Sequence, residues 1–116
     1  MQVNAGMMEA ADFHLGRLLE HLQTKGQLDN TIVVVTSDNG PAIGSAGPLR
    51  GRKGSTFEGG MRESTVVRWP GKIPAGTVND SLVSTIDLMP TFLEAAESTT
   101  PPDVQGKSLL SLAMGR

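Results

Sequence analysis

The chain has 116 residues, enough for one domain or part of one, and its formal net charge of −2 gives no field that would attract nucleic acid or an anionic membrane. It contains no cysteine, which excludes disulfide bonds, zinc–thiolate sites and a thiol nucleophile. No segment approaches the roughly 20 apolar residues of a membrane span, and the first residues lack the pattern of a signal peptide. Because only 3% of the residues are aromatic, we expect a core of aliphatic side chains.

The first predicted elements are a long helix and a strand. Apolar residues recur every three to four positions between residues 3 and 24, which predicts an amphipathic helix, and Gly26 is placed to end it in a left-handed conformation. The continuous apolar run within residues 31–36 predicts a strand covered on both faces. A helix that leads by a short turn into such a strand is typical of an α/β sheet flanked by helices.

The second half of the chain begins with a long glycine-rich segment. Residues 40–60 contain seven glycines and two prolines, which predicts a loop without helix, and a loop of this length is usually functional. Residues 64–70 predict a second strand, and residues 86–96 predict a helix with Thr85 as its N-cap. So few strands make a thin sheet, which would leave sheet edges and apolar helix faces exposed.

Asp38 and Asn39 follow the first predicted strand, at the carboxyl end where open α/β sheets place their ligands. Carboxylate and amide oxygens suit hard cations such as Ca²⁺ or Mg²⁺. Since neighbouring side chains of a strand point to opposite faces, both could reach one ion only if the strand ends at Ser37 or Asp38. A simple turn, in which Asp38 bonds its own backbone, would explain the same residues.

The glycine-rich loop also carries Arg50, Arg52 and Lys53. Cations on such a backbone suit an anionic substrate, although a solvated basic loop would have the same sequence. The segment is not a GxxxxGK[ST] phosphate-binding loop, because Arg52 stands where that pattern needs glycine. Glu58 and Arg62, four residues apart, are expected to form a structural ion pair.

Five segments, taken together, resemble the sulfatase family, arylsulfatases in particular. They are "VVVTSDNGP", "LRGRKGSTFEGGMRE", "RWPGKIPAG", "STIDLMPTFLEAA" and "QGKSLLSL". Each is weak evidence alone, but they occur in the family's order and at its usual spacings between residues 5 and 115. The resemblance implies an α/β fold that is part of an alkaline-phosphatase/sulfatase-like sheet flanked by helices.

The resemblance also implies roles for three residues in the hydrolysis of a sulfate ester. By similarity, Asp38 and Asn39 are ligands of Ca²⁺ (or Mg²⁺), and Lys53 is the catalytic residue that contacts the sulfate group. The family's nucleophile is a formylglycine made from the first residue of a C/S-x-P-x-R segment, and this sequence contains no such segment. The family's other acidic metal ligands and its other active-site histidine and lysine positions are also missing, and Ser64 stands where proline is usual. We therefore expect no turnover by this chain alone.

By resemblance, residues 1–116 are the last part of a sulfatase catalytic domain, before the family's small C-terminal subdomain. Within it lie the metal-bearing strand end at 31–40, the active-site loop at 40–60, and a closing helix and tail at 81–116. We expect pairing with the missing N-terminal part, or self-association. Two alternatives remain open: a free-standing non-catalytic module that binds ions or self-associates, and a phosphoesterase relative. The compartment is open too, since the family's usual export fits a periplasmic, lysosomal or secreted parent.

Overall fold

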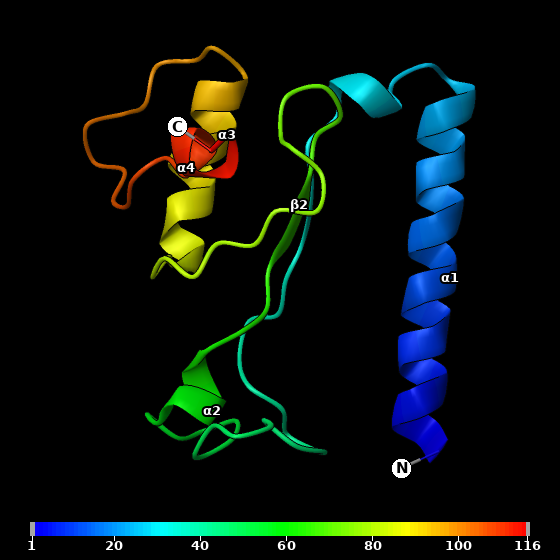
Figure 1. The fold of residues 1–116 in the computed structure, drawn as a ribbon, viewed down its shortest axis with the longest axis vertical. Coiled ribbons are helices and arrows are strands. Elements are labelled where there is room, and N and C mark those ends of the chain that lie inside the picture. Colours follow the sequence, from blue (N-terminus) through cyan, green and yellow to red (C-terminus); the bar gives the residue numbers. More distant parts are fainter. Residues whose placement is uncertain (1, 116) are drawn as a thin grey trace.

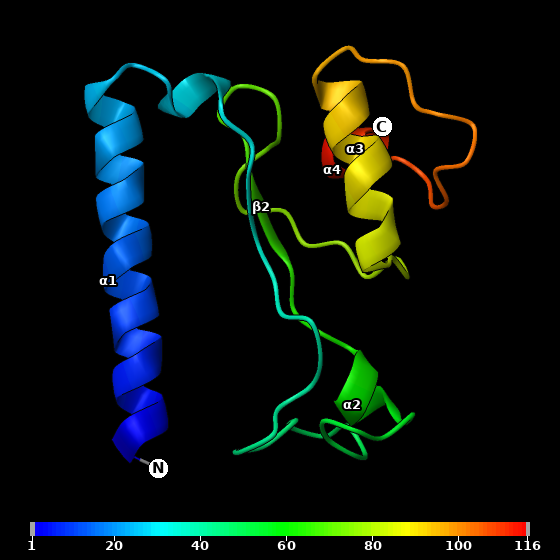
Figure 2. The same cartoon turned by 180° about the vertical axis from the view of Figure 1, so that it is seen from behind.

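The computed structural model describes residues 2–115, which form four α-helices, two 3₁₀ turns and a two-stranded sheet (Figure 1). The helices are α1 (Gln2–Thr24), α2 (Glu58–Met61), α3 (Leu88–Ala95) and α4 (Leu110–Ala113), and the strands are β1 (Val33–Val35) and β2 (Val66–Arg68). In both Figure 1 and Figure 2 the strands run through the middle, with α1 on one side and α3 with α4 on the other. The glycine-rich loop and α2 lie together beyond one end of the sheet.

Helix α1 ends as the sequence predicts. Gly26 has a φ of 64°, its N–H donates to the Gln23 carbonyl at 3.0 Å, and the Gln27 N–H donates to the Leu22 carbonyl at 2.9 Å. This pair of bonds around a left-handed glycine is the Schellman motif, which satisfies two carbonyls of the last turn. The chain then reverses through the 3₁₀ turn Leu28–Asn30 and enters β1.

The two strands pair antiparallel, with Val33 opposite Arg68, Val34 opposite Val67 and Val35 opposite Val66. Each strand has three residues, so the predicted strands at 31–36 and 64–70 were too long at both ends. The prediction that the first strand is covered on both faces is wrong for this chain, since Val35 is 44% exposed. No further strand joins the pair within residues 2–115, so each strand keeps one unpaired edge.

Helix α3 begins after a 3₁₀ turn, and Thr85 is not its cap, contrary to the sequence prediction. Asp87 is the residue before α3, and Ser84 caps the 3₁₀ turn Thr85–Asp87, with its backbone N–H donating to Asp87 Oδ2 at 2.8 Å. The other oxygen of Asp87 accepts the backbone N–H of Lys107 at 2.8 Å, which ties the C-terminal tail to the start of α3. These two donors, that of Lys107 first, lower the pKa of Asp87 below its ordinary value of 3.8.

Most of the apolar surface of the chain is open to solvent. Within the described residues Leu28 and Leu110 are the buried hydrophobic side chains, each 8% exposed. The accessible surface is 9137 Å², whereas a compact protein of 12.2 kDa has about 6,000 Å². The radius of gyration is 16.2 Å, against about 13 Å for a compact chain of this length. The expected aliphatic core is therefore not closed within this chain.

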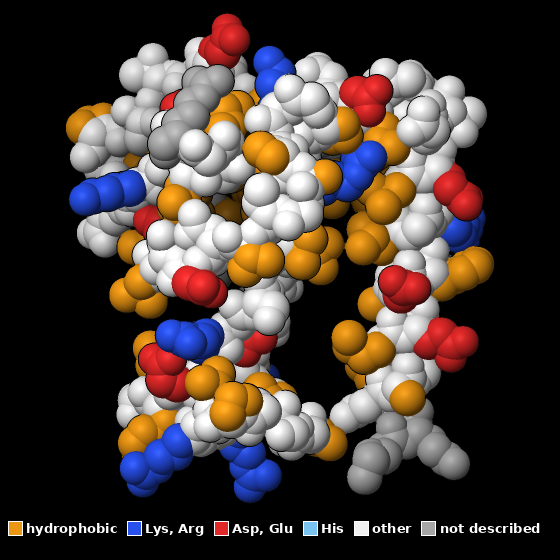
Figure 3. All heavy atoms as spheres, viewed as in Figure 1, with side chains coloured by type: hydrophobic (Ala, Val, Ile, Leu, Met, Phe, Trp, Pro, Cys, Tyr) orange, Lys and Arg blue, Asp and Glu red, His pale blue; other side chains and the backbone are white. Residues whose placement is uncertain are grey.

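Helix α1 contributes much of this exposed surface. It carries several large hydrophobic side chains that are more than half exposed: Val3, Met7, Met8, Phe13 and Leu18. Figure 3 shows hydrophobic side chains along the inner side of α1 that face open space. A helix with an uncovered apolar face requires a partner to bury it.

We predict that the attachment of the tail to α3 depends on the charge of Asp87. Because folding lowers the pKa of Asp87, this attachment stabilises the folded state above pH 3.8 and is lost as the pH falls through the lowered value. The hydrogen-exchange protection of the Lys107 amide, measured by NMR, should drop in that range and should be low at every pH in Asp87→Asn. Asp103→Asn, an exposed change in the same tail, is the control. Equal protection in Asp87→Asn and the unmodified chain at neutral pH would contradict this role.

Candidate metal and sulfate site

The two chain segments that form the sheet stay together past its end. The hydroxyls of Thr36 and Thr65 hydrogen-bond at 2.8 Å immediately after the last strand pair, and farther on the Gly40 N–H donates to the Gly60 carbonyl at 3.0 Å. Residues 36–40 therefore run beside residues 60–65, as Figure 1 shows between the sheet and α2. Asp38 and Asn39 lie between these two tie points.

The turn after β1 leaves oxygen atoms of both predicted metal ligands available. The Ser37 hydroxyl donates to the Asn39 carbonyl at 3.0 Å, so Ser37 rather than Asp38 supplies the side-chain bond of this turn. The Asn39 Nδ2 donates to the Gly40 carbonyl at 3.0 Å, which leaves its Oδ1 as a free acceptor. Asp38 is exposed, and in the described part of the chain its carboxylate takes part in no ion pair.

Close packing of glycines holds the loop against this turn. A Cβ added at Gly40 would overlap the Gly59 carbonyl oxygen and lie 2.9 Å from the Gly60 Cα. A Cβ at Gly59 would lie 2.8 Å from the Arg50 carbonyl oxygen, which accepts the Gly59 N–H at 2.8 Å. Contacts this close exclude any side chain, so the backbone approach requires glycine at these positions. The loop is therefore fixed where it meets the residues after Asn39.

Lys53 lies at the tip of a turn within the loop. The Ser55 N–H donates to the Arg52 carbonyl at 2.9 Å, and Gly54 has a φ of 88°, which together describe a turn over residues 52–55 with Lys53 in its second position. The Lys53 side chain is exposed, and its backbone N–H donates to the Pro41 carbonyl at 3.2 Å. The backbone of Lys53 is thus bonded to a residue two positions after Asn39.

The structure corrects the prediction that the loop contains no helix, because residues 58–61 form the single turn α2. The predicted pair of Glu58 and Arg62 is confirmed, with 2.9 Å between Arg62 Nε and Glu58 Oε2. Both side chains are more than half exposed, so this pair adds little stability.

Sequence reasoning missed a second contact of the loop, in which the guanidinium carbon of Arg50 lies 3.8 Å from the centre of the Phe57 ring.

Glu63 is a further acidic residue in this region, and no sequence pattern singles it out. It lies in the segment beside residues 36–40, and its Oε1 is buried without a hydrogen-bond partner among the described residues. A buried carboxylate oxygen without a donor is costly, so the neighbourhood of Glu63 lacks a group that would satisfy it.

The oxygen ligands that this chain offers are of the type that a hard cation prefers, but they are too few to hold one. Asp38 and Asn39 offer a carboxylate and an amide oxygen, but Ca²⁺ takes six to eight oxygen ligands. Within residues 2–115 no three His, Cys, Asp or Glu residues lie close enough together to hold a metal ion. The chain therefore carries at most part of a metal site.

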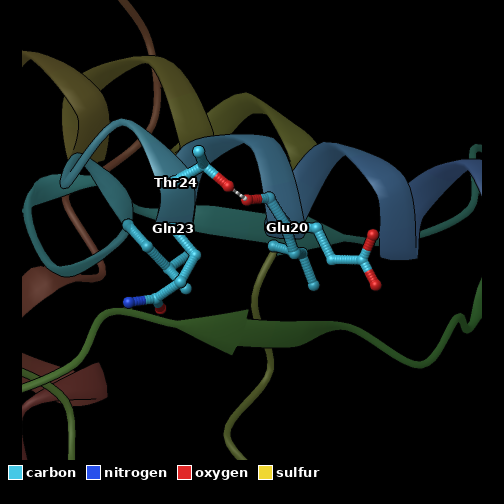
Figure 4. A pocket seen from close by; sticks show the side chains of 5 residues that line it. Glu20, Gln23 and Thr24 are labelled. Carbon is cyan, nitrogen blue, oxygen red and sulfur yellow. Dashed lines mark hydrogen bonds between the residues drawn. The ribbon is translucent and has the colours of Figure 1, made fainter.

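A shallow hollow elsewhere on the chain has no part in this site. It lies between the last turns of α1 and the 3₁₀ turn and is lined by Leu19, Glu20, Gln23, Thr24 and Leu28 (Figure 4). On its α1 side, the Thr24 hydroxyl donates a hydrogen bond to the Glu20 carbonyl at 2.8 Å. The glycine-rich loop lies beyond the opposite end of the strands.

The family comparison and the curated relatives both point to sulfatases. The model of the Sulfatase family matches residues 1–98. Human N-acetylgalactosamine-6-sulfatase is 44% identical over 115 residues, a match that covers 90% of this chain and 22% of that enzyme. The crystal structure of Ps i-CgsB superimposes with a TM-score of 0.88 at 36% identity, covering 96% of this chain and 26% of that one. The phosphonate monoester hydrolase SpPMH from Silicibacter pomeroyi gives a TM-score of 0.74 at 32% identity, covering 90% and 20%.

The chain belongs to the sulfatase family. It spans about a fifth of the length of the curated relatives that it matches. The predicted fold class is confirmed: the chain is a piece of an α/β sulfatase-like fold, and its sheet is flanked by helices. Within residues 2–115, no helix is both long and apolar enough to cross a membrane.

We predict that the glycine contact at Gly40 is required for the geometry of the loop. In Gly40→Ala the new methyl group would overlap the Gly59 carbonyl and force the loop away, at a cost of about 1–3 kcal/mol in the free energy of unfolding. NMR spectra should show shifted amide signals for Lys53 and Gly60.

Gly16→Ala, on the exposed face of α1 where nothing lies within 4 Å of the new Cβ, is the matched control and should leave these signals in place. Unchanged Lys53 and Gly60 amides in Gly40→Ala would show that the contact does not hold the loop.

Proposed function

We propose that this chain forms one side of the active site of a sulfuric ester hydrolase, in which Asp38 and Asn39 bind a divalent cation and Lys53 binds the sulfate group. The main support is the joining of the turn after β1 to the glycine-rich loop, through the bonds from Gly40 to Gly60 and from Lys53 to Pro41. This arrangement presents two oxygen donors and a lysine from neighbouring backbone segments.

Each residue has a distinct part in this proposal. The Asp38 carboxylate and the Asn39 Oδ1 would contribute two of the oxygen ligands of Ca²⁺, or of Mg²⁺ in its place, and such a cation would supply Lewis-acid chemistry. The ammonium group of Lys53 neutralises the negative charge of the sulfuryl oxygens, while the bonding electrons of the ester pass to the leaving oxygen. Lys53 suits this role because its side chain is exposed at the tip of a fixed turn.

The nucleophile has to come from outside this sequence, which has no C/S-x-P-x-R segment from which formylglycine could form. We therefore expect the chain to act together with the N-terminal part of a sulfatase catalytic domain. The exposed area supports such pairing, because an excess of about 3,000 Å² on this one partner is well above the roughly 800 Å² that each partner buries in a standard interface. The uncovered face of α1 and the free strand edges are the surfaces that this part would cover.

Two other functions have specific support. The same exposed surface would serve a free-standing, non-catalytic module that binds ions and self-associates. The similarity to a phosphonate monoester hydrolase keeps a phosphoesterase function open. Combining the chain with a part that carries the nucleophile distinguishes these functions from the first proposal. A non-catalytic module would give no hydrolysis. A phosphoesterase would hydrolyse a phosphate ester faster than a sulfate ester.

We predict that hydrolysis of 4-nitrophenyl sulfate appears when the chain is combined with an N-terminal sulfatase part that carries formylglycine. Lys53→Ala should lower kcat in this complex about 100- to 1,000-fold, the effect of removing one group that stabilises developing charge. Lys25→Ala, an exposed change just after α1, is the control and should retain full activity. Hydrolysis by the 116-residue chain alone, or full activity of Lys53→Ala in the complex, would contradict the proposed roles.

We predict that tight Ca²⁺ binding requires both parts. The 116-residue chain alone should show little or no rise in Tm at low millimolar Ca²⁺, because two ligands cannot replace the hydration shell of the ion. In the complex Ca²⁺ should raise Tm, and Asp38→Asn should shift this rise to higher Ca²⁺ concentration. Asp29→Asn is the control, because it also removes one negative charge but lies in the exposed 3₁₀ turn, away from the site. An identical Ca²⁺ response in the two variants would exclude Asp38 as a ligand.

A further inference from the structure

The glycine-rich loop holds one arginine in a fixed orientation. The guanidinium carbon of Arg50 lies 3.8 Å from the centre of the Phe57 ring, a distance at which the ring face attracts the cation. A guanidinium group stacked in this way keeps the N–H donors at its edge available. In the described part of the chain Arg50 forms no ion pair, whereas Arg62 of the same region is paired with Glu58.

The backbone around this stack is closely packed. The Arg50 carbonyl accepts the Gly59 N–H at 2.8 Å, and a Cβ added at Gly51 would lie 2.8 Å from the Phe57 Cβ. These contacts set the positions of Arg50 and Phe57 relative to each other and to α2. A donor group held before its ligand arrives loses less conformational entropy on binding.

Basic residues outnumber acidic ones in the loop, where Glu58 is the one acidic residue and is paired with Arg62. Residues 40–57 contain three cations (Arg50, Arg52 and Lys53) and no acidic residue, in a chain whose net charge is −2. Figure 3 shows Lys and Arg side chains at the end of the molecule formed by the loop and α2. A local positive patch of this kind favours ligands with more than one negative charge.

Arg50 and Lys53 are neighbouring exposed cations of the loop. They are three residues apart, so their Cα atoms are separated by at most about 11 Å, and each side chain is long and exposed. Lys53 is a compact point charge, whereas Arg50 offers a planar fork that matches a sulfate or a carboxylate in a bidentate manner. The loop therefore contains two different anion-binding groups in neighbouring positions.

We propose that the Arg50–Phe57 stack is a second anion subsite beside Lys53, and that the substrate is a sulfate ester with a second anionic group, such as a multiply sulfated sugar. This inference rests on the proposed contact of Lys53 with the sulfate group. Arg50 contacts the second anion directly, and Phe57 is a positioning residue that orients the guanidinium group.

The test is a calorimetric titration of the chain in complex with an N-terminal sulfatase part whose nucleophile is replaced by alanine, at low salt, with one disaccharide in three forms: one sulfate, two sulfates, or one sulfate and a carboxylate. We expect both disaccharides with two anionic groups to bind about fivefold more tightly than the monosulfated form. The difference in affinity between the disulfated and the carboxylated disaccharide shows which anion the subsite prefers. Arg50→Ala should reduce this preference to less than about twofold, and Phe57→Leu, which keeps the charge and removes the stack, should reduce it in part.

Arg17→Ala is the matched control. Arg17 also lies near a phenylalanine, with 5.9 Å from its guanidinium carbon to the centre of the Phe13 ring, but it is on α1 and not in the glycine-rich loop. It should leave the preference unchanged. Retention of the Gly59 amide signal in NMR spectra shows that the loop of Arg50→Ala is still folded.

The proposal is wrong if the unmodified chain shows no preference, if Arg50→Ala retains it, or if Arg17→Ala loses it equally. A separate result would show that the proposed function fails. In that case Lys53→Ala and the unmodified chain would bind the monosulfated form with equal affinity. In that case a preference that still depends on Arg50 would mark the loop as an anion-binding surface without a role in hydrolysis.

Discussion

The candidate site depends on the close approach of the backbone at Gly40 to the backbone at Gly59 and Gly60. The sheet itself consists of three residue pairs, too few to fix the position of a loop of some twenty residues. The glycine contact and the bond from the Gly40 N–H to the Gly60 carbonyl provide a second tie beyond the sheet. All of the chemistry proposed for this chain lies between or beside these two ties.

The same architecture leaves the rest of the chain dependent on a partner. Side chains that have the periodicity of a core helix in α1 are exposed, and each strand keeps a free edge. In a member of the sulfatase family that spans about a fifth of its relatives, this is the expected appearance of a piece cut from a larger sheet. The buried, unpartnered oxygen of Glu63 fits the same interpretation, because a missing segment could supply its donor.

Local sequence signals predicted those parts of the fold that are determined locally. The apolar period and Gly26 predicted α1 and its end, because helix periodicity and a left-handed glycine depend on few neighbours. The turn α2 was missed, since two glycines in four residues count against a helix and only packing against the loop compensates. The prediction of Thr85 as a cap is wrong because the cap depends on the Asp87 carboxylate accepting the Ser84 N–H, a geometry that residue types do not specify.

The candidate site was found through an ordered set of motifs rather than through physical pattern alone. The residues themselves favoured a simple turn at Asp38 and Asn39, and Lys53 was equally consistent with a solvated loop. The structure adds that Ser37 makes the turn bond and that the Lys53 backbone is bonded to Pro41. The stack of Arg50 on Phe57 had no sequence signal, since contacts across seven residues of irregular loop follow from tertiary packing.

The central claim is that this chain works as one part of a larger sulfatase domain. The most direct measurement is the size of the native protein in its source cells, by immunoblotting with an antibody raised against residues 40–60. The account predicts a single band several times larger than 12.2 kDa, since the chain spans 22% of its human relative. A band at 12.2 kDa, with no larger species and no sulfatase part in complex with it, would contradict this claim and favour the free-standing module.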